Sequence, residues 1–395
     1  MFRRYAISEI GDIISGATPK TTVPDNFGGE IPWLTPADLS GYTGKYISHG
    51  ARNLTRQGYD SCSTHLMPAG TVLLSSRAPI GYVAIAKNEI CTNQGFKSIV
   101  PKTFVNSEFL YYQLKSLENT LQNLGSGTTF KELSAKKLAT VQVVIPSLEE
   151  QKSIVSKIEE LFSRLDASVA ELQTAKEKLK VYRQAVLFRA FQNLTDTITM
   201  DKVADMIDPQ PSHRTPPEVM DGVPYIGVGD IDYSVHKVNF SEARKVSPSV
   251  LEEHRERYTL HKGDFIIGKI GTIGKPFVVP LPQDYTLSAN VILIQPNCEK
   301  IVPEFLYWQF SSPLVTQQLT TGAAATNQQA FGIKKARLLS IKMCCVELQR
   351  QIVSEIEGAL SICDSIQQTI DTSLRLANAL RQSILKQAFE GALAT

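Results

Sequence analysis

The sequence predicts an α+β protein made of two tandem globular domains, each followed by a long helix, with the helices pairing as an antiparallel coiled coil of pseudo-two-fold symmetry. The first observation behind this prediction is an internal repeat, because segments of the first half return 192 to 198 residues later. The second is a stretch of heptad-spaced apolar residues at the end of each copy. A repeat this long is a duplicated domain pair, since solenoid units span only about 20 to 50 residues. The clearest matching segments are 31–34 with 223–226, 68–74 with 261–267, 108–113 with 304–309, and 151–159 with 349–357.

Each globular part is predicted to mix short strands with helices. In the first copy, β-rich runs at 71–74, 82–86 and 141–145 are punctuated by Gly, Pro and Asn, and a helical stretch covers 107–124. This order has no regular strand–helix–strand rhythm, which favours an α+β domain. The predicted division is 1–146 and 193–345 for the two globular domains, and 147–192 and 346–395 for the two helices.

The first long helix has a recognisable start. Ser147 is its expected N-cap, and Glu150 stands three residues later, which is a capping-box pattern. From there to about Ala190 the chain contains neither Gly nor Pro. The second copy has Cys344 and Cys345 where the first has Pro-Ser, so its N-terminus is expected to fray more easily.

Apolar residues spaced seven apart form the predicted seam between the two helices. The alternative is an amphipathic helix packed on its own globular domain, although helices this long are unusual on single domains. A two-fold relation between duplicated halves makes the predicted pairing antiparallel. The seam residues are Ile158, Leu161, Leu165, Leu172, Leu179 and Val186 in the first helix, and Ile356, Ile366, Ile370, Leu380 and Ile384 in the second.

Composition excludes several classes of protein. No apolar run approaches the 18 or more residues that span a bilayer, and the N-terminus lacks the apolar region of a signal peptide. The six cysteines form no CxxC motif and share no spacing with the six histidines, so we expect no metal site and a reduced cytoplasmic location. A net charge of +2 is low for a protein that grips DNA unaided.

No catalytic motif is recognisable. The segment 271–275 contains Gly-Lys but lacks the spacing of a phosphate-binding loop, and 208–211 does not fit the Asn/Asp-Pro-Pro-aromatic element of DNA amino-methyltransferases. Nuclease, serine-hydrolase and zinc-protease motifs are also missing. The sequence therefore indicates a binding protein that is not catalytic by itself.

The order of domains and helices resembles the specificity subunit of Type I restriction–modification systems over essentially the whole chain. The segments that carry this resemblance are 145–151, 125–133, and 380–391 with its echo at 182–191. The second copy departs from the family pattern at 322–328, which leaves a shared role for the loop at 125–133 open.

The resemblance implies a DNA-binding function. Each globular part would be a target recognition domain that reads one half of a bipartite, asymmetric DNA sequence. The helices would act as spacer and as dock for two methyltransferase subunits, and restriction subunits would join this core for host defence. S-adenosylmethionine, ATP and Mg would bind to those partners and no cofactor to this chain. Adenine-specific DNA methylation and cleavage would thus belong to the assembled complex, with no membrane involved.

Base readout needs polar side chains on loops or helix ends, and three segments of each globular part supply them. The alternative is that Asn, Ser and Gly in these segments only build turns. Trp33, Tyr225 and Trp308 are expected in the core. The candidate DNA-contacting residues are Thr35, Asp38, Ser75, Ser76, Arg77, Thr92, Asn93, Gln94, Lys97, Thr128 and Lys131 in the first copy, and Asp230, Lys269, Thr272, Ser288, Asn290 and Asn327 in the second.

Two other classes of function are considered. A scaffold whose coiled coil joins two ligand-binding domains that never touch DNA would show the same repeat. An enzyme with a diverged catalytic domain is the third hypothesis. Binding to DNA with a cognate methyltransferase, and methylation by the chain alone, would separate the three.

Overall fold

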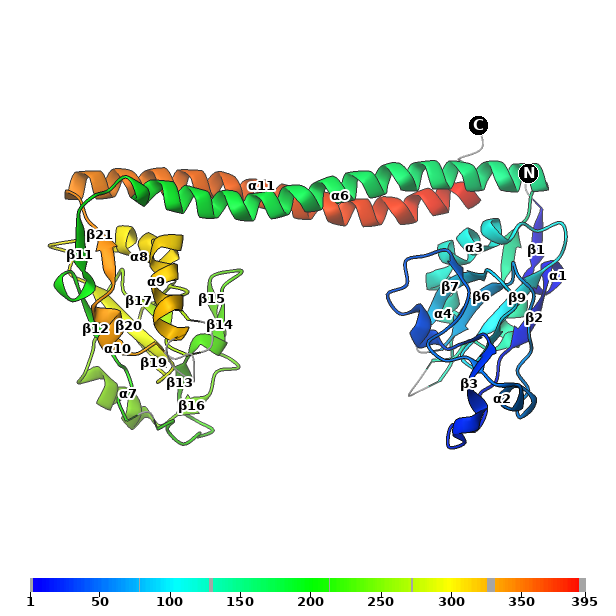
Figure 1. Cartoon of the computed structure of the whole chain (residues 1–395), viewed down its shortest axis with the longest axis horizontal. Coiled ribbons are helices and arrows are strands. Elements are labelled where there is room, and N and C mark those ends of the chain that lie inside the picture. Colours follow the sequence, from blue (N-terminus) through cyan, green and yellow to red (C-terminus); the bar gives the residue numbers. More distant parts are fainter. Residues whose placement is uncertain are drawn as a thin grey trace. The chain divides into compact units, whose positions relative to one another are not determined.

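The computed structural model describes residues 3–77, 79–127, 131–212, 214–270, 273–324 and 331–390. Contacts within the chain divide it into two compact units. Unit 1 comprises Met1–Leu172 together with Thr372–Thr395, and unit 2 comprises Gln173–Asp371. Each unit therefore contains one globular part and a portion of both long helices, α6 (Leu148–Gln192) and α11 (Val346–Phe389) (Figure 1).

Unit 1 is built on a five-stranded sheet of order β2-β9-β6-β7-β5. Its pairs are antiparallel, except that the edge strand β5 runs parallel to β7. Two small pairs lie outside this sheet, β1 with β10 antiparallel and β4 with β8 parallel, and β3 forms only isolated bridges to Leu54 among the described residues. The strands are β1 (Arg4–Ala6), β2 (Gly11–Ser15), β3 (Phe27–Ile31), β4 (Trp33–Leu34), β5 (Tyr46–Ile47), β6 (Val72–Ser76), β7 (Ile80–Ala86), β8 (Cys91–Thr92), β9 (Lys97–Pro101) and β10 (Gln142–Val144).

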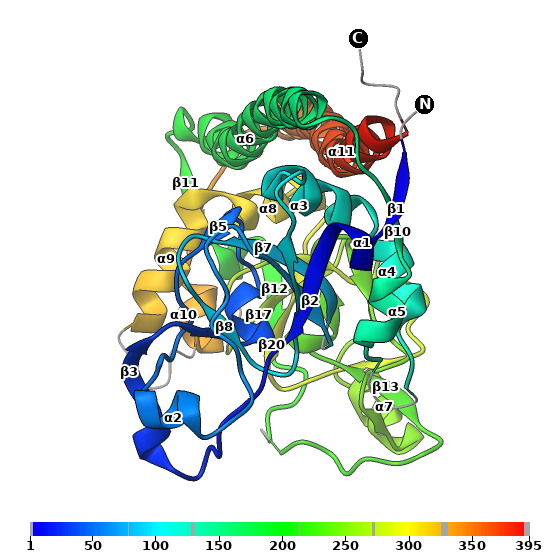
Figure 2. The same cartoon turned by 90° about the vertical axis from the view of Figure 1, so that its right-hand side faces the viewer.

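Helices cover one face of this sheet. The helical stretch predicted at 107–124 is broken at Leu117 into α3 and α4. In unit 1, α3 lies between the sheet and the pair of long helices (Figure 1, Figure 2). The short helices are α1 (Ile7–Ile10), η1 (Pro24–Asn26), η2 (Pro36–Leu39), α2 (Arg56–Asp60), α3 (Ser107–Ser116), α4 (Glu118–Leu124) and α5 (Ala135–Ala139).

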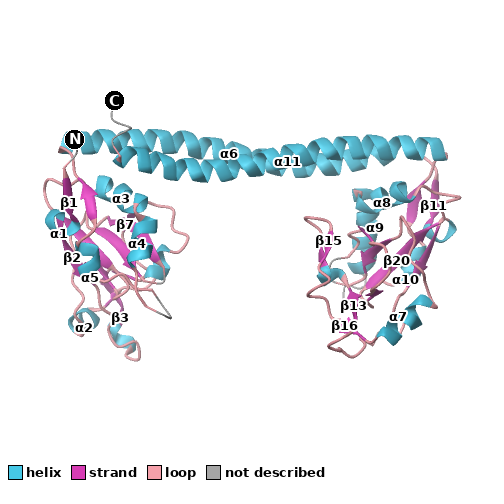
Figure 3. Ribbon diagram, turned by 180° about the vertical axis from the view of Figure 1, so that it is seen from behind, coloured by secondary structure: helices cyan, strands magenta, loops and turns pink. Residues whose placement is uncertain are grey.

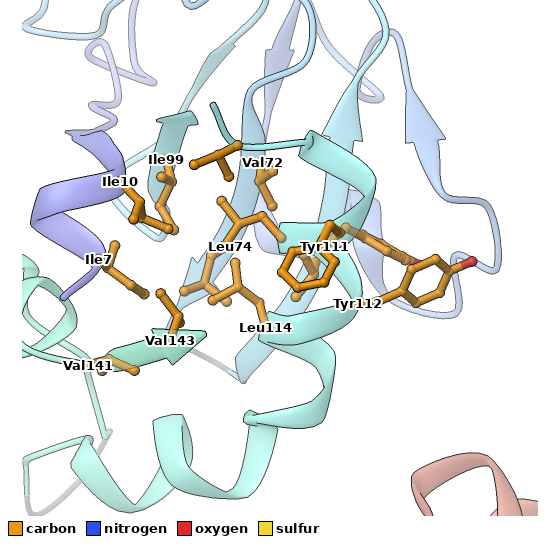
Figure 4. Packing of buried hydrophobic residues seen from close by; sticks show 14 of the residues in the cluster. Ile7, Ile10, Val72, Leu74, Ile99, Tyr111, Tyr112, Leu114, Val141 and Val143 are labelled. Atoms are coloured by element: carbon orange, nitrogen blue, oxygen red, sulfur yellow. The ribbon is translucent and has the colours of Figure 1, made fainter. Parts of the chain in front are cut away.

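The core of unit 1 follows the two-residue period of its strands. Val72 and Leu74 of β6 face the main cluster under α3, whereas Leu73 between them joins a second cluster on the other face. Both faces of β6 are thus buried. Figure 4 shows the main cluster, in which Leu114 of α3 meets the sheet residues while Tyr112 lies at the margin.

Unit 2 repeats the same plan, with one strand fewer in its main sheet. Its main sheet has the order β12-β20-β17-β18, and β13 pairs parallel with β19 as β4 does with β8. Figure 3 shows the strands of each unit in magenta. The strands are β11 (Thr197–Thr199), β12 (Ala204–Ile207), β13 (Val223–Ile226), β14 (Ile231–Asp232), β15 (Lys237–Val238), β16 (Lys245–Val246), β17 (Phe265–Gly268), β18 (Phe277–Val278), β19 (Thr286–Leu287), β20 (Val291–Pro296) and β21 (Ser340–Lys342). The short helices are η3 (Met200–Lys202), η4 (Val228–Asp230), α7 (Pro248–Arg255), α8 (Pro303–Ser311), α9 (Pro313–Ala324) and α10 (Ile333–Arg337).

The predicted capping box is present at the start of α6. The backbone N–H of Ser147 donates to Glu150 Oε2 at 3.0 Å, and the N–H of Glu150 donates to Ser147 Oγ at 3.3 Å. These hydrogen bonds with Ser147 hold the pKa of the Glu150 carboxyl below its usual range. The box satisfies donors that a helix N-terminus otherwise leaves unpaired.

A buried glutamine ties the start of each long helix to its globular part. The Gln151 side chain is fully buried, accepts from the Asn106 N–H at 2.7 Å and donates to Phe104 O at 2.9 Å. In unit 2, Gln349 is equally buried and accepts from the Val302 N–H at 2.8 Å. The duplication has kept this connection in both copies.

The long helices pair with each other and also pack on the globular parts, so both interpretations of the sequence apply. In unit 1, Ile154, Val155 and Ile158 of α6 share one core cluster with Leu385 and Ala388 of α11 and with the globular part. In unit 2, the cluster contains Leu187 and Phe191 of α6 together with Ile352, Val353 and Ile356 of α11. Within each unit the helices therefore pack on the globular part as well as beside each other.

Ion pairs show that the helices are antiparallel in each unit. In unit 2, Lys176 pairs with Asp371 and Arg183 with Asp364, both at 2.7 Å, so one heptad forward on α6 matches one heptad backward on α11. In unit 1, Arg381 of α11 pairs with Asp166 of α6.

Part of the predicted seam is displaced. Ile356, Ile370 and Ile384 are buried, as are Ile158 and Leu179, while Leu161, Leu165, Leu172 and Val186 are half-buried. Ile366 and Leu380, however, are 45% and 50% exposed. The apolar stripe of Ile356, Ile370 and Ile384 forms the buried face of α11. Ile366 and Leu380, which belong to the series offset by three residues, lie at the edge of the seam.

Replacing Gln151 with Ala should destabilise the protein. The change leaves buried backbone groups without partners, at a cost of about 1–3 kcal/mol for each such group. Urea unfolding followed by circular dichroism should show a lower midpoint for Gln151→Ala. Gln184→Ala, on the exposed surface of the same helix, is the matched control and should leave the midpoint unchanged. Equal midpoints for the two variants would contradict the role of Gln151.

Candidate functional site

Three loops meet at the end of the sheet in unit 1. They lie at the ends of β4, β6 and β8 and carry candidate residues. The Asn93 N–H donates to Leu34 O at 2.8 Å, and the Ser76 N–H donates to Gly95 O at 2.7 Å. A fourth segment, at Leu133, joins these loops, because the Leu133 N–H donates to Ser76 O at 2.8 Å.

Unit 2 repeats these backbone hydrogen bonds with different residues. The Ser288 N–H donates to Ile226 O at 2.8 Å, and the Lys269 N–H donates to Asn290 O at 2.8 Å. The Phe331 N–H donates to Lys269 O at 2.9 Å. We call this arrangement the loop frame of each unit, meaning the backbone at 34, 76, 93, 95 and 133 in unit 1 and at 226, 269, 288, 290 and 331 in unit 2.

The loop frame of unit 2 needs a glycine at one close approach. A Cβ atom on Gly227 would lie 2.6 Å from both Ser288 Oγ and Asn290 Oδ1. Ser288 Oγ also donates to Asn290 Oδ1. The candidate residues Ser288 and Asn290 are therefore held together beside the η4 turn.

Several candidates build the loops instead of facing outward. Ser75, Ser76 and Thr92 are completely buried, and Ser288 is 7% exposed. Ser75 Oγ donates to Pro79 O at 2.7 Å and accepts from the Tyr82 N–H at 2.9 Å, which holds the turn between β6 and β7. These buried side chains do not present a surface to a base edge, and the turn-building interpretation applies to Ser75.

The two candidate aspartates accept hydrogen bonds from residues of their own loops. Asp38 accepts from the Thr35 N–H at 2.7 Å, from Thr35 Oγ1 at 2.8 Å and from the Ala51 N–H at 2.8 Å. Asp230 accepts from the Gly227 N–H at 2.8 Å. Both carboxylates therefore fix equivalent 3₁₀ turns, η2 and η4.

The basic candidates at the sheet end are paired with acids. In unit 1, Glu132 lies 3.4 Å from Arg77 Nη1 and 3.6 Å from Lys97 Nζ. In unit 2, Lys269 Nζ lies 2.7 Å from Asp208 Oδ2, and both side chains are largely buried. These pairs lower the positive charge that each loop frame offers to phosphate.

The accessible candidates are fewer. Gln94 and Lys131 are exposed, Asn93 and Asn290 are half-buried, and Arg77 keeps 36% of its side chain accessible. Thr128, Thr272 and Asn327 lie outside the described residues.

Two exposed arginines beside the loop frames were missed by the sequence analysis. Arg244 lines a cleft of unit 2 with Tyr225, Asp230 and Asn290. Arg52 of unit 1 stands 192 residues earlier in the sequence, with its guanidinium 4.8 Å from the centre of the Phe27 ring. The offset of the repeat was the signal that could have found them, because 192 is also the offset of Asp38 and Asp230.

Among the described residues, no three His, Cys, Asp or Glu side chains gather in a way that could hold a metal ion. None of the helices in the same part of the chain is both long and apolar enough to cross a bilayer.

The family model described as "Type I restriction modification DNA specificity domain" matches residues 2–177. The chain is similar to the Type I restriction enzyme MjaIX specificity subunit of Methanocaldococcus jannaschii, with 48% identity over 38% of this chain and 35% of that protein. It is also similar to the EcoBI specificity subunit of Escherichia coli, with 24% identity over 99% of this chain and 86% of that protein.

Two solved structures share the fold. A chain from a structural study of complex assembly and conformational transition of the type I R-M system has a TM-score of 0.73 at 19% identity, covering 99% of this chain and 98% of its own. The HsdS subunit from Thermoanaerobacter tengcongensis has a TM-score of 0.60 at 17% identity, covering 99% and 97%. The predicted fold class is confirmed by these likenesses.

Proposed function

We propose that the chain is a specificity subunit of the Type I restriction–modification family and that it recognises a bipartite, asymmetric DNA target. Unit 1 reads one half of the target and unit 2 reads the other. The observation that carries the proposal is the loop frame, which has the same backbone hydrogen bonds in both units and different side chains on them.

The differences between the two loop frames support two different half-sites. Ser76 of unit 1 is replaced by Lys269 in unit 2, and Gly95 by Asn290. Each base pair shows its own pattern of donors and acceptors in the major groove, so a change of side chain changes the base that fits. Arg52 and Arg244, exposed at equivalent positions, are suited to phosphate or guanine contacts.

The weak positive charge of the chain supports a shared grip on DNA. The formal net charge is +2, and Arg77, Lys97 and Lys269 are paired with acids. Phosphate contacts supply much of the affinity in protein–DNA complexes, so partners have to provide part of them. These partners are two methyltransferase subunits with S-adenosylmethionine, joined by restriction subunits that use ATP and Mg. This chain supplies recognition and no catalysis.

Exposed apolar side chains support the long helices as the dock for these subunits. In unit 2, Val181 of α6 is 70% exposed and Ile362 of α11 is 64% exposed. In unit 1, Leu376 and Leu380 of α11 are 63% and 50% exposed. Large apolar residues repeated along an exposed helix pair mark a surface for protein contact. The alternative of a scaffold that never touches DNA is not favoured by the likeness to specificity subunits.

Exchanging residues 1–146 for the matching segment of another specificity subunit should change one half-site only. Gln151, Ile154, Val155 and Ile158 remain, so the incoming segment must present a matching surface to α6. Methylated adenines mapped by sequencing, with the cognate methyltransferase present, give the readout. The reciprocal exchange of 193–345 is the control and should alter the other half-site. A change of both half-sites in either exchange would contradict the proposal that each unit recognises its own half-site.

Inserting one heptad into each long helix should lengthen the gap between the half-sites. Insertions after Leu172 and after Asp371 fall at the boundary of the two units, so each interhelical ion pair keeps its partner. Seven residues add about 10 Å at ~1.5 Å per residue, or about three base pairs at ~3.4 Å each. Both half-site sequences should stay the same in the methylation map.

A heptad inserted after Leu172 alone is the control for the spacer. It shifts α6 against α11 and should prevent assembly with the methyltransferase, because the seam and its ion pairs no longer match. Methylation at the original gap length by the double insertion would show that the helices do not set the spacing.

A further inference from the structure

A lysine is enclosed between the globular part and the long helix in unit 1. Lys45 Nζ lies 2.5 Å from Glu108 Oε1 of α3 and also contacts Glu159 Oε1 of α6. It lies 5.9 Å from the centre of the Tyr112 ring, and Tyr46 donates to Glu108 Oε1 at 2.7 Å. The Lys45 ammonium group thus bridges a glutamate of α3 and a glutamate of α6 beside the Tyr112 ring.

The pKa values agree with a tightly held ammonium group. Burial acts to lower the pKa of Lys45, but the hydrogen bonds with Glu108 and Glu159 outweigh it and raise that pKa. Burial acts to raise the pKa of Glu108, and the bond with Lys45 outweighs it in the opposite direction. Both groups are therefore charged at neutral pH.

Unit 2 repeats the acids and the aromatic residue, but its equivalent lysine, Lys237, lies in β15, which pairs with β14. Glu304 and Trp308 of α8 stand at the positions of Glu108 and Tyr112, and Glu357 of α11 stands at the position of Glu159. In the described part of unit 2, neither glutamate has an ion pair. Glu304, Trp308 and Glu357 line an open groove with Tyr307, Phe277 and Val278, which we call the glutamate groove.

A difference in strand pairing leaves this groove open. In unit 1, β5 carries Tyr46 next to Lys45 and joins the main sheet alongside β7. The corresponding segment of unit 2, Lys237–Val238, forms β15 and pairs with β14 instead. The main sheet of unit 2 therefore ends at β18, and among the described residues no lysine forms an ion pair with the two acids.

The groove has the chemistry of a cation site. Two carboxylates beside a tryptophan attract an ammonium or guanidinium group, and tryptophan is the strongest of the aromatic side chains in this respect. Lys262 and His236 also line the groove, but neither forms an ion pair with Glu304 or Glu357 in the structure. Glu357 belongs to α11, so the groove continues the surface assigned above to methyltransferase docking.

We propose that the glutamate groove of unit 2 receives a lysine or arginine side chain of a methyltransferase subunit, in the place that Lys45 fills in unit 1. This inference rests on the proposed function for the identity of the partner. Unit 1 shows from the same chain which group such a site holds.

The full chain carrying Glu304→Gln and Glu357→Gln together tests the proposal. Its affinity for the purified cognate methyltransferase subunit should fall at least about tenfold, because two charge-assisted contacts are lost. Glu256→Gln with Glu299→Gln is the matched control, since both are exposed glutamates of unit 2 outside the groove. This control removes the same charge and should bind like the unchanged chain. Thermal unfolding of both variants should match the parent.

The outcomes separate this inference from the proposed function. Unchanged affinity of the groove variant, while the parent binds the methyltransferase, overturns the groove alone. No binding by the parent chain overturns both proposals.

A zero-length carbodiimide identifies the occupant if it is a lysine. The reagent joins a carboxylate to an amine as an amide and takes up the water as its urea. A cross-link from Glu304 or Glu357 to a methyltransferase lysine, found by mass spectrometry, supports the proposal. A cross-link to Lys237 of the same chain would show that the protein closes its own groove and would overturn it.

Discussion

Neither globular part has a complete hydrophobic core without the two long helices, and the rest of the structure depends on this constraint. In unit 1, Ile158 of α6 and Leu385 of α11 belong to the same buried cluster as the sheet residue Leu74. In unit 2, Phe191 and Ile356 play the same part. A long amphipathic helix gains most of its stability from packing its apolar face. Folding of the sheets and pairing of the helices therefore stabilise each other, and the buried Gln151 and Gln349 fix the point where each helix begins.

Because the buried sheet and the long helices hold each unit together, the side chains of the loops can vary in sequence. The loop frame is held by backbone hydrogen bonds at the end of a buried sheet, so its geometry does not depend on which polar side chains it carries. Duplication kept the frame and the two aspartates that fix η2 and η4, while Ser76 became Lys269. A rigid frame with exchangeable side chains is suited to reading different sequences with one fold.

The sequence predicted what depends on local spacing and missed what depends on tertiary pairing. The repeat, the Ser147 capping box and the buried series of Ile356, Ile370 and Ile384 follow from residue order, and all are present. The site was harder because a Ser or Thr after a strand can point into a turn or toward solvent, and Ser75 and Thr92 point inward. Arg52 and Arg244 carried a usable signal in their common offset. The different pairing of β5 and β15 had no signal in the sequence, since a strand of two residues is too short to show an alternating pattern.

Divergence between the copies has consequences for any partner that binds both units. A duplicated chain offers two similar surfaces, but Lys45 neutralises Glu108 and Glu159 in unit 1, while Glu304 and Glu357 have no ion pair among the described residues of unit 2. An approaching basic side chain meets a satisfied ion pair in the first case and two free carboxylates in the second. Displacing Lys45 would leave a partly buried ammonium without its acids, which is costly. Two identical partners would therefore bind the two units with unequal affinity, and the difference would lie beside the long helices, away from the loop frames.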